Sequence, residues 1–190
     1  MQIEPLGLDG PLLITPVRHG DARGFFSEVF RGDLLASHGV EATFVQDNHA
    51  ASAQRGVVRG LHYQLPPSEQ GKLVRCTRGA VLDVVVDIRA GSPSFGRHLS
   101  TELSALNWRQ IWVPSGFAHG YVTLTEDTEV LYKATSYYDP AAERGIAWDD
   151  PTLAIDWRVP VSEVILSAKD RSNPWLADAD VTFTYGAVPR

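Results

Sequence analysis

Short apolar runs separated by turn residues recur along most of the chain, and this rhythm constrains the fold more than any other feature. The runs lie at 12–17, 25–30, 73–77, 80–88, 98–104, 110–114, 119–125 and 129–138, with Gly, Pro, Asn or Asp at many of the breaks. Runs of this length and spacing predict β-strands joined by tight turns. The expected fold is all-β, an antiparallel double-sheet jelly roll or barrel with a few short peripheral helices.

One early helix is expected over the sequence DLLASH at 33–38, with Asp33 capping its start and Gly39 ending it. The chain has no internal repeat and no linker-like segment, and 190 residues are enough to bury a substantial core. A single domain over 1–190 is therefore expected. The segment from about 150, rich in Pro and Trp, is expected to wrap the barrel with short helical turns.

Charge and composition exclude several classes of protein. A net charge of -6 argues against a general nucleic-acid surface, although a local cluster of Arg and Lys could still hold one phosphate group. No run approaches the roughly 20 apolar residues that a membrane span requires. The single cysteine, Cys76, cannot form an internal disulfide, and the N-terminus does not resemble a secretion signal. We therefore expect a cytoplasmic protein.

Strand alternation places two polar side chains on apolar faces. Tyr132 shares a face with Val130, which predicts that its ring points into the barrel. Lys72 shares a face with Val74. Burying an isolated ammonium group is costly, so Lys72 is either functional or begins its strand and extends its amine to water. Taken alone, Lys72 is better explained by the second interpretation.

Two histidine segments are candidates for chemistry. His62 lies in a strand-like run, and His119 ends the pattern P-x-G-x-x-H at 114–119, which is half of a motif pair found in cupin barrels, often at metal sites. The other half is incomplete, because Tyr63 and Gln64 follow His62 where a metal site would offer a second histidine and then a glutamate. A nitrogen-rich Fe, Zn or Mn site is therefore poorly supplied, and a barrel without metal is favoured.

Longer stretches are similar to one family of enzymes. They are DARGFFSEVFR at 21–31, FVQDN at 44–48, RGLHYQLPP at 59–67, QGKLVRCTRGAVLDVVVDIRAGSPSFG at 70–96, WVPSGFAHGY at 112–121, VLYKATSYYDPAAERGIAWDDP at 130–151 and LSAKDR at 166–171. In this order and spacing they resemble the dTDP-4-dehydrorhamnose 3,5-epimerases, which are metal-independent, cupin-like jelly rolls. A mild departure is His49, where the family usually carries a small polar residue.

The resemblance implies a substrate and a reaction. The substrate is a dTDP-linked 4-keto-6-deoxy sugar, inverted at carbons 3 and 5 for dTDP-L-rhamnose biosynthesis without a metal or other cofactor. A C–H group beside the ketone is acidic, so a base can form an enolate and an acid on the opposite face can return a proton. By resemblance, His62 is the base, Asp170 its partner and Tyr132 the acid, while Lys72 stabilises the enolate oxygen. Without the resemblance, Asp170 would be an ordinary turn residue.

The resemblance also implies a substrate-binding set. Arg23 and Arg59 match diphosphate-binding positions, and Tyr138 matches an aromatic residue that stacks on thymine. The other matching positions are Lys72, Glu28, Gln46, Asp47, Asn48, His119, Glu143 and Lys169. Strand alternation places Arg59 and His62 on opposite faces, so a shared site requires a bulge at Gly60.

The sequence is also compatible with several alternatives. The protein could invert only one carbon, as relatives in antibiotic-sugar pathways do, or it could be a metal-dependent cupin oxygenase or isomerase that uses His62, His119 and a carboxylate. Metal analysis of the purified protein distinguishes that last class. A noncatalytic sugar-binding module is a third alternative, disfavoured by the complete set of proposed catalytic residues. A homodimer is expected, because family members pair through barrel strands and exposed strand edges need covering.

Overall fold

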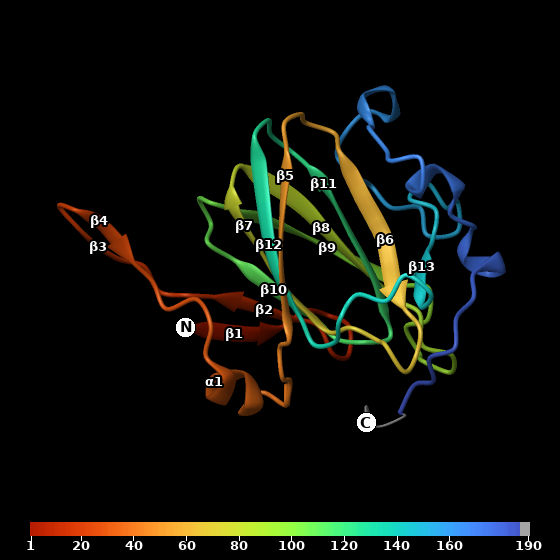
Figure 1. Ribbon diagram of the computed structural model, residues 1–190, viewed down its shortest axis with the longest axis horizontal. Coiled ribbons are helices and arrows are strands. Elements are labelled where there is room, and N and C mark those ends of the chain that lie inside the picture. The colour runs from red at the N-terminus through yellow and green to blue at the C-terminus, as the bar shows by residue number, and fades with distance from the viewer. Residues whose placement is uncertain (187–190) are drawn as a thin grey trace.

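Two facing antiparallel sheets form the body of the computed structural model, which describes residues 1–186 (Figure 1). The six-stranded sheet has the order β1 (Gln2–Pro5), β2 (Leu12–Thr15), β10 (Gln110–Val113), β7 (Lys72–Arg78), β12 (Thr128–Ala134) and β5 (Gln46–Ser52). The five-stranded sheet has the order β13 (Glu143–Gly145), β6 (Val58–Gln64), β11 (Phe117–Thr123), β8 (Ala80–Asp87) and β9 (His98–Ser104). The expected all-β, double-sheet fold is confirmed.

Apolar side chains from both sheets meet in the interior. Val74 and Val130 of the six-stranded sheet pack in one cluster with Val81 and Val85 of β8, and each of these side chains is completely buried. Because successive residues of a strand point to opposite faces, the polar residues that share these inward positions are also directed between the sheets. The interior can therefore present functional side chains from both sides.

The C-terminal segment covers the outer face of the five-stranded sheet. Trp157 and Leu176 are buried in a second cluster with Leu82 and Val84, the outward residues of β8. Three short 3₁₀ helices lie along this segment: η1 (Val161–Glu163), η2 (Asp170–Ser172) and η3 (Leu176–Asp178). Since η2 contacts β6, the packing of the segment brings its polar residues to the edge of the barrel interior.

The early helix is present as α1 (Gly32–Ala36), but its predicted N-cap is wrong. Arg31 occupies the capping position, and Asp33 lies inside the first turn, where its carboxylate accepts a hydrogen bond from Arg31 Nε at 2.9 Å. The Asp33 carboxylate therefore pairs with Arg31, and no side chain caps the start of the helix. Gly39 ends the helical turn as predicted, with a φ of 82° and a hydrogen bond from its N–H to the Ala36 carbonyl at 3.0 Å.

A two-stranded hairpin, β3 (His19–Asp21) and β4 (Gly24–Phe26), projects away from both sheets (Figure 1). The strand predicted over 25–30 is wrong beyond Phe26. The chain there crosses to the six-stranded sheet, where Gln110 Nε2 donates a hydrogen bond to the Val29 carbonyl at 2.8 Å. In the part of the chain that the structure describes, no helix is long and apolar enough to span a membrane.

Candidate active site

A cavity of about 270 Å³ lies between the two sheets and the C-terminal segment. Seven of the residues predicted from the sequence line it: Arg59, His62, Lys72, His119, Tyr132, Lys169 and Asp170. They come from four strands and from the segment around η2. Ala50, Tyr121 and Ser167 also line the cavity and were not predicted. Tyr121 could have been predicted, because it lies two positions after His119 in one strand and therefore shares its face.

His62 and Asp170 form a hydrogen-bonded pair. His62 Nε2 lies 2.5 Å from Asp170 Oδ1, and Ser167 Oγ donates to Asp170 Oδ2 at 2.8 Å. Burial alone would raise the pKa of Asp170, but the hydrogen bonds from His62 and Ser167 outweigh it and hold this pKa below its usual value. Because an ionised carboxylate only accepts hydrogen bonds, Nε2 of His62 is the donor and Nδ1 is left to act as a base.

An irregularity in β6 lets both Arg59 and His62 reach the cavity. The register between β6 and β11 shifts between these two residues, as expected for a bulge. Gly60 has a φ of 140°, and a Cβ atom at this position would lie 2.4 Å from the Cα atom of Gly120. Only glycine fits this approach of two strands, so the bulge predicted at Gly60 is confirmed.

Tyr132 and Lys72 reach the cavity from the opposite sheet, as strand alternation predicted. Burial raises the pKa of the Tyr132 phenol, although Arg59 opposes this, so the phenol remains a protonated acid at neutral pH. Protein atoms surround the Lys72 amine even though part of the side chain is open to the cavity. This desolvation lowers the pKa of Lys72 to about 8, with Glu143 and Asp83 opposing the shift. Lys72 is therefore still mostly charged at neutral pH.

A hydrogen-bonded rim connects the cavity to the exposed ring of Tyr138. The Tyr138 hydroxyl donates to Glu143 Oε2 at 2.5 Å, and Glu143 also binds the ammonium group of Lys169, which lines the cavity. Gln46 Oε1 accepts from the Tyr138 backbone N–H at 2.9 Å, and Gln46 Nε2 donates to Asn48. The predicted residues Gln46, Asn48, Tyr138, Glu143 and Lys169 thus form one connected group.

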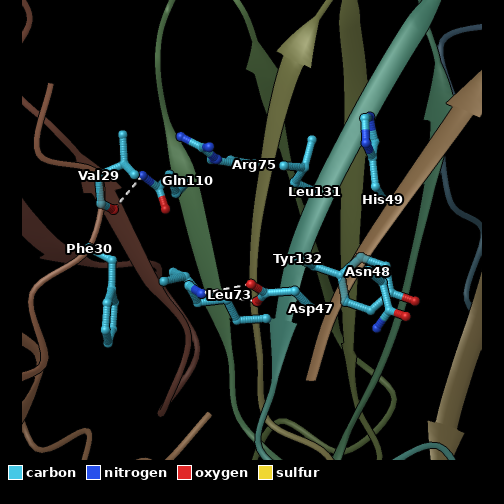
Figure 2. A pocket seen from close by; sticks show the side chains of 11 residues that line it. Val29, Phe30, Asp47, Asn48, His49, Leu73, Arg75, Gln110, Leu131 and Tyr132 are labelled. Carbon is cyan, nitrogen blue, oxygen red and sulfur yellow. Dashed lines mark hydrogen bonds and ion pairs between the residues drawn. The ribbon is translucent and has the colours of Figure 1, made fainter. Parts of the chain in front are cut away.

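Three other predicted binding residues do not line the cavity of their own chain. Asp47 points away from Asn48, its neighbour on β5, and binds Lys133 Nζ at 2.9 Å (Figure 2). Arg23 lies in the projecting hairpin with 91% of its side chain exposed, paired with Asp21. Glu28 follows the same hairpin. The family resemblance predicted that Asp47, Arg23 and Glu28 bind the substrate. In a single copy of the chain, these three residues lie outside the cavity.

A second groove, of about 190 Å³, lies on the outer face of the six-stranded sheet (Figure 2). Leu73 and Leu131 form its floor, and Val29 and Phe30 of the segment after the hairpin form one wall. Arg75 also lines it. This groove opens on the outer face of the sheet, whereas the cavity that contains His62 lies between the two sheets; Tyr132 lines both.

His119 has its own carboxylate partner, which sequence reasoning missed. His119 Nε2 lies 2.9 Å from Asp83 Oδ2, and Asp83 is completely buried. The sequence did contain a signal for this partner, because Asp83 is a carboxylate at an inward position of the apolar run AVLDVVVDI. Among residues 1–186, no three His, Cys, Asp or Glu side chains converge as a group of metal ligands.

Comparison with known proteins identifies the family of the chain. A family model described as dTDP-4-dehydrorhamnose 3,5-epimerase matches residues 5–178. The enzyme of that name from Sinorhizobium fredii is 49% identical over 99% of this chain and 96% of its own. The crystal structure of a 3,5-epimerase from Legionella pneumophila, in complex with dTDP-4-keto-L-rhamnose, matches with a TM-score of 0.93 and 44% identity, covering 98% of this chain and 99% of its own. A dTDP-4-dehydrorhamnose 3-epimerase from Streptomyces niveus is 39% identical over 94% of this chain and 86% of its own. The chain therefore belongs to the dTDP-4-dehydrorhamnose 3,5-epimerase family.

Proposed function

We propose that this protein is an isomerase that converts dTDP-4-dehydro-6-deoxy-D-glucose to dTDP-4-dehydro-L-rhamnose by inverting carbons 3 and 5, for dTDP-L-rhamnose biosynthesis. The observation that carries the proposal is the position of His62 and Tyr132 on facing sheets of one cavity. Inversion requires a proton to leave one face of a carbon and another to arrive at the opposite face. Membership of the epimerase family supports the same reaction.

The proposed steps use only side chains of this chain. His62 Nδ1 takes the proton from a carbon beside the ketone, and the electron pair of that C–H bond moves to form the enolate. Lys72 stabilises the negative charge on the enolate oxygen, and Tyr132 gives its proton to the opposite face of the carbon. Asp170 stabilises the imidazolium formed on His62. Exchange with solvent then returns both groups to their starting protonation states.

The remaining cavity and rim residues are proposed to hold the nucleotide and sugar. Arg59 offers a guanidinium group for the diphosphate, and Lys169 adds a second positive charge at the rim. The half-exposed ring of Tyr138 is available to stack on thymine. His119 is proposed to contact the sugar or a phosphate. Gln46, Asn48 and Glu143 are proposed to orient the nucleoside.

Incubation with the 4-keto sugar in heavy water tests the function. We expect NMR spectroscopy to show deuterium at both C3 and C5, with inverted configuration at both carbons, because one base and one acid can serve either side of the ketone. The relative named a 3-epimerase makes single-carbon inversion the second candidate. Label and inversion at C3 alone would favour that candidate. A substrate that gains no deuterium would contradict the proposed function.

We further propose a homodimer in which the β3–β4 hairpin of one copy reaches the cavity of the other. The hairpin projects from its own sheets, and Phe25 and Phe26 on it are 50% and 73% exposed. The outer groove also leaves Val29, Phe30 and Leu131 only partly buried, and a second copy could bury them further. In this arrangement Arg23 and Glu28 would serve the partner's substrate, which accounts for their distance from the cavity of their own chain.

The dimer proposal predicts a mass twice that of one chain in light scattering. It also predicts complementation: if Arg23→Ala and His62→Ala proteins are denatured, mixed and refolded, mixed dimers contain one site with both residues intact. With random pairing, about a quarter of all sites recover both residues. A monomeric mass at micromolar concentration would contradict the dimer. Absence of recovered activity in a confirmed mixed dimer would contradict the exchange of hairpins.

We propose the cytoplasm as the location and one domain as the working unit. Cys76, the single cysteine of the sequence, is buried as a free thiol, which a reducing compartment preserves. Residues of the C-terminal segment belong to the apolar cluster on the outer face of the five-stranded sheet and also line the cavity. The segment and the barrel are therefore proposed to function together.

A further inference from the structure

Asp83 is a buried carboxylate with incomplete hydrogen bonding, and it contacts His119, which lines the cavity. Its Oδ2 accepts from His119, but its Oδ1 is buried and has no hydrogen-bond partner among the described residues. Asp87 provides a contrast, because it lies on the same strand and the same face and its side chain is also completely buried. Asp87 is bound by Arg89, Ser92 and Ser94. An unsatisfied buried carboxylate lowers stability, so its presence beside a cavity-lining histidine points to a function.

The position of Asp83 relates it to two cavity residues. His119 lies directly opposite His62 in the pairing of β11 with β6, so the two histidine–carboxylate pairs are neighbours. Burial raises the pKa of Asp83, while His119 and Lys72 oppose that shift. In return, the charge of Asp83 favours protonation of Lys72 and partly offsets the lowering of the lysine pKa by burial.

We propose that Asp83 is a positioning residue that acts through His119 and Lys72. Its Oδ2 accepts a hydrogen bond from the Nε2–H of His119 and so leaves Nδ1 to accept a hydrogen bond from a sugar hydroxyl. Its negative charge also keeps Lys72 protonated beside the enolate oxygen. This inference rests on the proposed epimerase function, since it assigns a purpose to Asp83 only if Lys72 and His119 contact the sugar.

The surrounding charges fix the direction of the expected pH effect. Lys72 is faced by Glu143 of β13, by Asp83 of β8 and by Lys169 of the C-terminal segment. Asp83 is also faced by His119 and by Tyr121, both of β11. Removing Asp83 leaves Glu143 as the carboxylate that supports the ammonium form of Lys72. The lysine pKa, about 8 in the unaltered protein, must then fall further.

Asp83→Asn tests the inference, with Asp87→Asn as the matched control. We expect Asp83→Asn to lower kcat by up to about 100-fold with little change in KM, because the nucleotide-binding residues are untouched. The high-pH limb of kcat/KM, where Lys72 loses its proton, should move to lower pH by about one unit or more. Asp87→Asn should reduce stability and leave this limb in place. An unmoved limb in Asp83→Asn, or an equal movement in both variants, would overturn the proposal.

The role of Asp83 can also be tested on the unaltered protein, so the proposal remains testable if Asp83→Asn does not fold. NMR spectroscopy of ¹⁵N-labelled histidine should show His119 with its proton on Nε2 and none on Nδ1. A proton on Nδ1 instead would overturn the proposal. This readout does not depend on turnover, whereas failure of the epimerase function would appear as absent deuterium exchange in the unaltered enzyme. The two failures are therefore distinguishable.

Discussion

Replacing His62 by alanine is expected to remove both deuterium exchange into the substrate and epimerisation. The loss should exceed the range of about 100- to 10,000-fold that is typical of a general acid or base. The reason is structural: Nδ1 of His119 is proposed to accept a hydrogen bond from a sugar hydroxyl, and Asp170 lies buried behind the imidazole, so neither offers a ready replacement base. Rates of exchange and inversion, measured by NMR spectroscopy in heavy water, check this prediction.

The control for His62→Ala must separate loss of the base from loss of folding. His38 is exposed next to α1 and lines neither the cavity nor the outer groove, so His38→Ala should retain normal rates. Thermal unfolding of both variants shows whether His62→Ala remains folded. Near-normal turnover by folded His62→Ala would contradict the assignment of the base.

Local sequence patterns predicted the central strands, though not β1, β5 or β13, and showed which side chains of those central strands face inward. Alternation correctly directed Tyr132 and Lys72 into the barrel, because a strand has only two faces and Val130 and Val74 identify the apolar one. The bulge at Gly60 needed the family resemblance as well, because only the resemblance required Arg59 and His62 to share a site. The directions of Tyr132 and Lys72 depend on neighbours within one strand, which the sequence displays directly.

Features that depend on tertiary packing could not be predicted from local patterns. His62 and Asp170 are 108 positions apart, and their hydrogen bond requires η2 to pack against β6. Family resemblance supplied that pair, but it could not show that Arg23 extends away from its own cavity. The contact between Asp83 and His119 depends on the register of β8 with β11, which no local signal specifies.

Tyr132→Phe is expected to uncouple deuterium exchange from epimerisation, which proceed together in the unaltered enzyme. The substitution preserves the volume of the ring and deletes the hydroxyl that is proposed to donate a proton from the six-stranded sheet. His62 can still remove a proton, Lys72 can still stabilise the enolate, and the same histidine can return a solvent-derived proton to the original face. Deuterium should therefore enter the substrate while epimerised product falls far more severely.

Tyr121→Phe is the matched control for Tyr132→Phe. Tyr121 lines the same cavity but comes from β11 of the five-stranded sheet, on the side of His62. Deleting its hydroxyl should leave exchange and inversion coupled. If Tyr132 were only structural, its substitution would behave in the same way, with a loss of stability of about 1 kcal/mol or somewhat more from a lost hydrogen bond.

The ratio of deuterium incorporation to epimerised product in Tyr132→Phe tests proton transfer from two opposite faces most directly. NMR spectroscopy in heavy water measures both quantities in one sample, with the unaltered enzyme and Tyr121→Phe as references. We predict that this ratio rises by about 100-fold or more in Tyr132→Phe, in line with the loss of a general acid. Exchange and inversion that fall together or persist together in that variant would contradict the account.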